Sequence, residues 1–148
     1  MAEAEPARWG AVKNVSHYVA YHSVRVMGRD YAPATDFSFL TRKPEATVRA
    51  AIGSTAWVIV GQRVSSRMQY LLAGAYTPCK VVDEGGSWVI SGPGTPLDPR
   101  LDVTTLPWFL TLKSEQKNFS LGFNRIQSTT VIDALMKIIP LVESRGRG

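Results

Sequence analysis

The stretch that decides the fold is Thr55-Ala-Trp-Val-Ile-Val60, which stands between Gly53 and Gly61. It is a continuous run of apolar, β-branched and aromatic residues, and no polar residues alternate with them. Successive residues of a strand point to opposite faces, so an uninterrupted apolar run is typical of a strand that is buried on both faces. The stretch therefore predicts a central strand with Trp57 in the core.

Shorter β segments connected by turns surround this central strand. β-branched and aromatic residues are frequent in them, which favours extended backbone. The predicted strands are residues 15–27, a short piece around Phe37 and Phe39, residues 68–76 with a bulge at Gly74, residues 79–82 and residues 87–91, with turns at 62–67 and 83–86. Because the last three strands follow one another closely, we expect them to form an antiparallel meander.

Two helices and one long loop complete the expected fold. Pro44 suits the first turn of a short helix that ends at Gly53, and hydroxyl residues at 128–130 suit the start of a helix over residues 131–139. Residues 92–107 contain four prolines, which predicts a loop without regular structure. The expected class is α+β, with five to seven mostly antiparallel strands bent into a small barrel and flanked by helices.

Residues 13–142 are expected to form one domain, between a flexible leader at residues 1–12 and a disordered basic tail at residues 143–148. The first residues lack the apolar segment of a signal peptide, and no apolar run approaches the roughly 20 residues that span a bilayer. Cys79 is the only cysteine, so no internal disulfide forms, which agrees with a reducing compartment. We expect a cytoplasmic protein with no membrane partner.

The sequence contains no recognisable catalytic or metal-binding constellation. His17 and His22 are five residues apart on a predicted strand, so they point to opposite faces and do not share a metal. Cys79 lies in apparent strand context and is expected to be a buried, inert thiol. The chain has neither a Gly-x-Ser-x-Gly elbow nor a phosphate-binding loop, which disfavours a hydrolase or transferase and predicts neither metal nor cofactor.

Charge and aromatic residues together indicate a binding function. The net charge is +5, from 17 Lys and Arg against 12 Asp and Glu, and a basic surface favours polyanionic partners. Basic residues stand beside aromatic ones in four places, where cations suit phosphates and aromatic faces suit unpaired bases. These places are Arg25 and Arg29 with Tyr21, His22 and Tyr31; Arg42 and Lys43 after Phe37 and Phe39; Arg63 and Arg67 before Tyr70; and Lys113, Lys117 and Arg125 around Phe119 and Phe123. In the alternative interpretation, the aromatic residues belong to the core and the charges are their solvated neighbours.

The order of these features resembles the PUA-like superfamily, especially EVE-type domains and their relatives fused to bacterial restriction nucleases. The resemblance rests on a His-Tyr-x-x-Tyr-His segment at residues 17–22, a short helix, residues 51–61, residues 70–76, and the segment 118–123 before the last helix. It implies a strongly bent β-barrel that accommodates a base flipped out of nucleic acid, often a modified one such as methylated cytosine. A partner nuclease domain or subunit elsewhere is implied as well.

The resemblance and the clusters together suggest which residues would act. The candidates for the base pocket are Tyr21, His22, Trp88 and Phe119 as stacking walls, with Ser38, Asn118 and Ser120 reading base edges; the candidates for phosphate binding are Arg29, Arg42, Arg63, Arg67 and Lys117. Trp108 is a second candidate, beside Trp88, for a residue at a pocket mouth. DNA is favoured over RNA as the partner, although the fold family serves both. A barrel that binds a small molecule or a protein remains the alternative.

Overall fold

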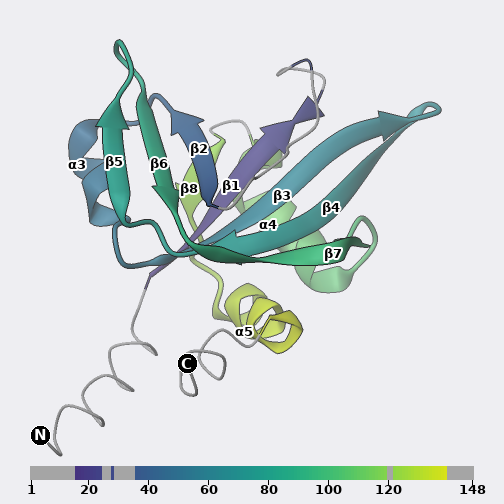
Figure 1. Ribbon diagram of the computed structural model, residues 1–148. Coiled ribbons are helices and arrows are strands. Elements are labelled where there is room, and N and C mark those ends of the chain that lie inside the picture. Colours follow the sequence, from purple (N-terminus) through teal and green to yellow (C-terminus); the bar gives the residue numbers. More distant parts are fainter. Residues whose placement is uncertain (1–15, 25–27, 29–35, 120–121, 140–148) are drawn as a thin grey trace, which may run out of the picture.

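The computed structural model describes residues 16–24, 28, 36–119 and 122–139 of the chain. Within them, eight strands form two sheets, accompanied by three α-helices and a short 3-10 helix (Figure 1). The elements are β1 (His17–Ser23), β2 (Phe37–Thr41), α3 (Glu45–Ala50), β3 (Thr55–Val64), β4 (Arg67–Tyr76), β5 (Lys80–Asp83), β6 (Trp88–Gly92), β7 (Gly94–Asp102), α4 (Pro107–Glu115), η1 (Lys117–Phe119), β8 (Phe123–Arg125) and α5 (Thr129–Ile138). The predicted α+β class is confirmed.

The predicted central strand is also confirmed. β3 is the middle strand of a five-stranded sheet with the order β7-β4-β3-β1-β8. Trp57 and Ile59 belong to the core on one face of this sheet, while Ala56 and Val58 belong to the core on the other. β1 runs parallel to β3, and the other strand pairs are antiparallel. Burial of both faces explains why the run at residues 55–60 has no polar alternation.

Each face of this sheet is covered by a different layer. On one face lie α4, η1 and α5, which contribute Phe109, Phe119 and Leu135 to the core around Trp57. On the other face lie α3 and the second sheet, which has three strands in the order β2-β6-β5. The two sheets are separate in the strand pairings of the described residues, so closure into a barrel stays a prediction.

The β3–β4 hairpin extends beyond the strands that flank it. β1 pairs with β3 only as far as Gly61, and β7 pairs with β4 only from Leu71 onward. Residues 62–69, which we call the arm, therefore pair only with each other among the described strands, and the arm projects from the sheet (Figure 1). The predicted turn at residues 62–67 is wrong in extent, because both strands continue to a turn of only two residues, Ser65 and Ser66.

The predicted bulge at Gly74 is confirmed, and it has a steric reason. The pairing of β4 shifts register between Leu72 and Gly74, and a Cβ atom on Gly74 would lie 2.6 Å from the carbonyl oxygen of Thr95. The antiparallel meander is wrong, because the chain leaves the five-stranded sheet after Tyr76 and starts the β5–β6 hairpin in the other sheet.

The predicted loop over residues 92–107 is wrong as well. Most of it forms β7, an edge strand that tolerates Pro96 and Pro99 because its outer side needs no amide donors. Pro107 starts α4 at the first helical position, where a missing amide hydrogen costs nothing. A third helix therefore joins the two that the sequence predicts.

The predicted cap of the last helix is confirmed, whereas the predicted burial of Cys79 is wrong. The Ser128 side chain accepts a hydrogen bond from the Val131 amide at 3.3 Å and caps α5 as predicted. Phe119 lies in η1, with a φ of 62°. Cys79 is exposed, in the segment that connects β4 of one sheet to β5 of the other.

Other predictions fall partly or wholly outside the described residues. The leader, the tail, and the predicted strand beyond Ser23 at residues 25–27 are in this group. None of the helices that the structure describes has the length and apolar character needed to cross a lipid bilayer. His17 and His22 lie on opposite faces of β1 as predicted, and the described residues contain no cluster of three metal-ligand side chains.

Candidate nucleic-acid interface

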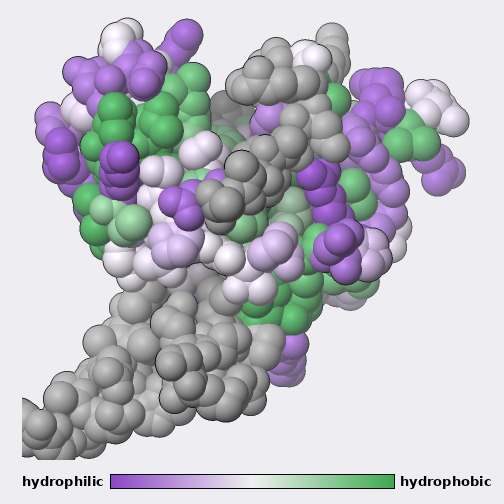
Figure 2. Space-filling view, in the orientation of Figure 1, coloured by the Kyte–Doolittle hydropathy of each residue, from purple (hydrophilic) through white to green (hydrophobic). Residues whose placement is uncertain are grey.

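The end of the arm carries two arginines and one valine, all exposed. Arg63 is the cross-strand partner of Met68, and Val64 is the partner of Arg67. Partners point to the same face of a hairpin and neighbours along a strand point to opposite faces, so Arg63 and Arg67 extend from opposite faces. The Val64 side chain shares the Arg67 face and is 49% exposed. Figure 2 shows this end of the arm, at the upper right, as mostly hydrophilic.

Further cations lie on the Arg63 face of the hairpin. Tyr70 follows Met68 by two residues and so shares its face, and the Lys113 ammonium of α4 lies 5.1 Å from the centre of the Tyr70 ring. Lys117 is exposed in η1, directly after α4. Glu115, between them, is occupied elsewhere, since its carboxylate accepts hydrogen bonds from the amides of Gln127 and Ser128. Arg63, Lys113 and Lys117 therefore place three cations on this side of the fold, with the Glu115 carboxylate between the two lysines.

Hydrogen bonds on the Arg67 face connect the arm to the edge of the sheet. The side-chain amide of Gln62 donates to the side-chain oxygen of Gln69 at 2.8 Å. The side-chain amide of Gln69 in turn donates to the carboxylate of Asp102 in β7 at 3.0 Å. Asp102 also accepts hydrogen bonds from the hydroxyl and the amide of Thr104, at 2.6 and 3.0 Å. These hydrogen bonds lower the pKa of Asp102, and the bond from the Thr104 hydroxyl contributes most. The carboxylate therefore remains charged and holds the part of the arm next to the sheet.

Two of the four predicted stacking walls, Tyr21 and Phe119, are already stacked on each other. The Tyr21 and Phe119 rings have centroids 4.6 Å apart and planes 10° from parallel. An inserted base needs about twice that separation, because each stacked pair prefers centroids at least about 4.5 Å apart. The Tyr21 hydroxyl lies over Gly61, where a Cβ atom would meet it, and burial followed by the charge of Tyr70 raises the pKa of Tyr21 to about 12. Tyr21 and Phe119 therefore form a closed stack that packs against Gly61, where the arm begins.

The remaining predicted base-pocket residues do not gather around this stack. His22 is buried on the opposite face of β1 from Tyr21, and Ser38 is exposed on the outer side of β2. Trp88 is half-buried in the second sheet, with the Arg49 guanidinium 5.8 Å from its ring centre. Asn118 is near the stack but exposed. The base pocket predicted from the sequence is thus divided among different parts of the fold.

The predicted phosphate-binding residues are also divided. Arg63, Arg67 and Lys117 lie on or beside the arm, whereas Arg42 is exposed after β2 at the other sheet. Arg29 and Ser120 lie outside the described residues. The interface that the structure supports is therefore the arm with the adjoining cations of α4 and η1.

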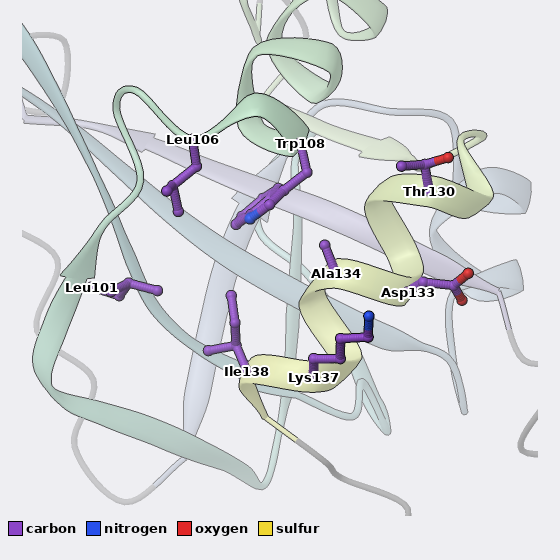
Figure 3. Close-up of a pocket in the computed structure, with 8 residues that line it drawn as sticks. All are labelled: Leu101, Leu106, Trp108, Thr130, Asp133, Ala134, Lys137 and Ile138. Carbon is purple, nitrogen blue, oxygen red and sulfur yellow. The ribbon is translucent and has the colours of Figure 1, made fainter.

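A separate pocket lies between β7, the start of α4 and α5 (Figure 3). Its volume is about 580 Å³, and its lining residues are Leu101, Leu106, Trp108, Thr130, Asp133, Ala134, Lys137 and Ile138. The Trp108 indole and aliphatic side chains form its apolar walls, while Asp133 and Lys137, one turn apart on α5, place opposite charges at its side. Trp108, a candidate for a residue at a pocket mouth, is one of the residues that line this pocket.

The chain was also compared with known proteins. No protein-family model, curated protein or solved structure matches it. The resemblance to EVE-type domains therefore stays a prediction.

Three features of the candidate sites were not predicted from the sequence. The contact of Lys113 with Tyr70 depends on α4, which was not predicted because the prolines before it indicated a loop. The exposure of Val64 depends on how far the strands continue beyond Gly61. The extent of the arm was missed as well, because residues 62–69 are mostly polar, with Val64 and Met68 as their only apolar residues, and show no period-two alternation.

Proposed function

We propose that this chain binds double-stranded DNA and that the arm is the element that enters the duplex. The single observation that carries the proposal is the arm itself, a two-stranded ribbon with Arg63 and Arg67 on opposite faces of its exposed end. A two-stranded ribbon fits the major groove of B-form DNA, which is about 12 Å wide and 8.5 Å deep. Arginines on opposite faces suit the two phosphate backbones that border such a groove.

The same geometry favours DNA over RNA. Double-stranded RNA has a deep and narrow major groove that side chains do not reach, so a ribbon of this kind has no equivalent site there. Lys113 and Lys117 extend the positive surface from the Arg63 face toward the body of the domain, where they suit the phosphates outside the groove. A nuclease domain or subunit associated with such a reader stays a prediction.

A titration of fluorescein-labelled duplex DNA at two salt concentrations tests the proposal. We expect salt-sensitive binding that is weakened by the double variant R63A/R67A, because log K falls with log salt by about 0.9 for each phosphate contact. Losing two contacts lowers the slope by about 1.8, which makes the change in affinity between 50 and 200 mM salt about 12-fold smaller. The control K80A/K137A removes two exposed charges elsewhere and should behave like the wild type. Equal losses in both variants contradict the proposal.

A second function is favoured by the pocket at Trp108. Its volume of about 580 Å³ is within the range of small-molecule sites, and its apolar walls with one carboxylate and one ammonium suit a flat ligand that carries polar groups. Binding there should depend little on salt and should quench Trp108 fluorescence, measured against a Trp108→Leu control. If duplex DNA fails to bind at low salt while small aromatic ligands quench Trp108, the pocket function replaces the first.

A further inference from the structure

The three-stranded sheet exposes a row of apolar side chains on its outer face. Leu40 of β2 and Val82 of β5 are both register partners of Val89 in β6, so the three side chains lie side by side across the sheet. Leu40 is 50% and Val82 is 37% exposed, whereas Ile90, which points to the other face, is buried in the core. Figure 2 shows hydrophobic residues among hydrophilic ones over β5, β6 and β2, at the upper left. The row therefore lies on a face that the core does not use.

Opposite charges lie on the two sides of this row, along β5. Lys80 precedes Val82 by two residues, and Glu84 follows it by two residues, so all three side chains share the outer face. The Glu84 amide donates to the Ser87 carbonyl at 2.8 Å, which continues the pairing of the hairpin through Glu84. Four residues of a strand separate the two charges by about 13 Å, too far for an ion pair within one chain. Neither charge forms a salt bridge within the part of the chain that the structure describes.

We propose that this face is the interface of a homodimer, a role that goes beyond the proposed function. The three-stranded sheets of two copies pack face to face with their strands antiparallel, about a two-fold axis that lies in the interface and runs perpendicular to the strands. This axis places the apolar row of each copy on the row of the other. It also reverses the strand direction, so Lys80 of each copy lies against Glu84 of the partner subunit. The face is thus complementary to an inverted copy of itself.

The size of the face indicates a weak dimer. Three strands about 4.8 Å apart, with five residues of about 3.3 Å each, span about 14 by 17 Å. This is less than the roughly 800 Å² that each partner contributes to a standard interface, so we expect reversible association that dilution disrupts. The face and the arm lie on different sides of the fold (Figure 1), so DNA binding by a single chain does not require the dimer. The variant K80A/K137A therefore remains a control for the DNA titration at concentrations where the chain is a monomer.

Sedimentation equilibrium from micromolar to near-millimolar concentration tests the proposal by charge exchange. The average mass of the wild type should rise toward that of a dimer as the concentration increases. K80E and E84K should each lower the association constant about tenfold, because both ion pairs then become contacts between like charges. An equimolar mixture of the two variants should associate about as tightly as the wild type, because the mixed dimer has opposite charges at both contacts.

The apolar row is tested by a matched pair of variants. L40S should weaken the association, whereas L110S should not, because Leu110 is equally exposed at 50% but lies on α4, which packs on the other sheet. Both side chains are exposed, so both variants are expected to fold, which circular dichroism checks. A wild type that remains a monomer over the whole range overturns the proposal. Association that L40S leaves unchanged, or that the mixture of K80E and E84K fails to restore, overturns it as well.

Discussion

Acid should destabilise this fold through one buried histidine, His17. The Trp57 indole donates a hydrogen bond to Nδ1 of His17 at 3.0 Å, and both residues are buried, with exposed fractions of 0% and 7%. An imidazolium has no acceptor at Nδ1, so protonation breaks this bond and also places a charge in the core. Burial accordingly lowers the pKa of His17 from its usual value near 6.5.

The sign and size of the effect follow from proton linkage. As the pH falls below 6.5, the unfolded chain takes up a proton at His17 before the folded chain does, so this contribution to stability is full above that pH and is lost as the pH falls. Because one proton is involved, the loss is at most about 1.4 kcal/mol for each pH unit below 6.5, and so at most about 1.4 kcal/mol at pH 5.5. For a domain of this size, that upper bound corresponds to a decrease in Tm of at most about 3–6 °C.

Urea denaturation between pH 5 and 7.5 measures this loss, with His17→Gln as the matched control. Glutamine does not titrate, and its carbonyl oxygen can accept the hydrogen bond of the indole. His22 and the carboxyl groups are the same in both chains, so the difference between the two pH profiles isolates His17. Parallel profiles for the wild type and His17→Gln would refute the reasoning.

Three further predictions concern the supports of the arm and of the last helix. Gly61→Ala should lower the free energy of unfolding by about 1–3 kcal/mol, because the new Cβ meets the Tyr21 ring. Chemical denaturation should show that the same substitution costs less in a Tyr21→Ala background, whereas additive costs of the two substitutions contradict this. Ser128→Ala should cost about 1 kcal/mol in the same assay, while Ser128→Asp, which also caps, should not. Asp102→Ala should accelerate amide hydrogen exchange in the arm, since it removes the acceptor for Gln69; unchanged exchange there argues against the anchor.

The sequence predicted the elements whose residue pattern is local. The uninterrupted apolar run at residues 55–60 predicted β3, and Ser128 before an amphipathic stretch predicted α5. The prolines between residues 92 and 107 predicted a loop where β7 and the start of α4 are found, because the effect of a proline depends on its position. A proline on the outer edge of a sheet or at the first position of a helix is tolerated, and only the tertiary arrangement reveals which case applies.

The candidate site was predictable only in part for a related reason. The sequence places Arg63 and Arg67 near each other, but their separation onto opposite faces depends on where the turn begins. Tyr21 and Phe119, two of the four residues expected as stacking walls, lie together, but their stacking distance of 4.6 Å makes them a support and not an open slot. The contacts of Lys113 with Tyr70 and of Phe119 with Tyr21 join residues that are distant in sequence, so they depend on how α4 and η1 pack on the sheet.

Chemical-shift mapping of the ¹⁵N-labelled chain with a B-form duplex tests the central claim most directly. If the arm enters the duplex, the largest amide shifts should occur in residues 62–69, with smaller ones around Lys113 and Lys117. Residues around the Trp108 pocket should change little. Shifts concentrated at that pocket or at the three-stranded sheet, with the arm unchanged, would contradict the account.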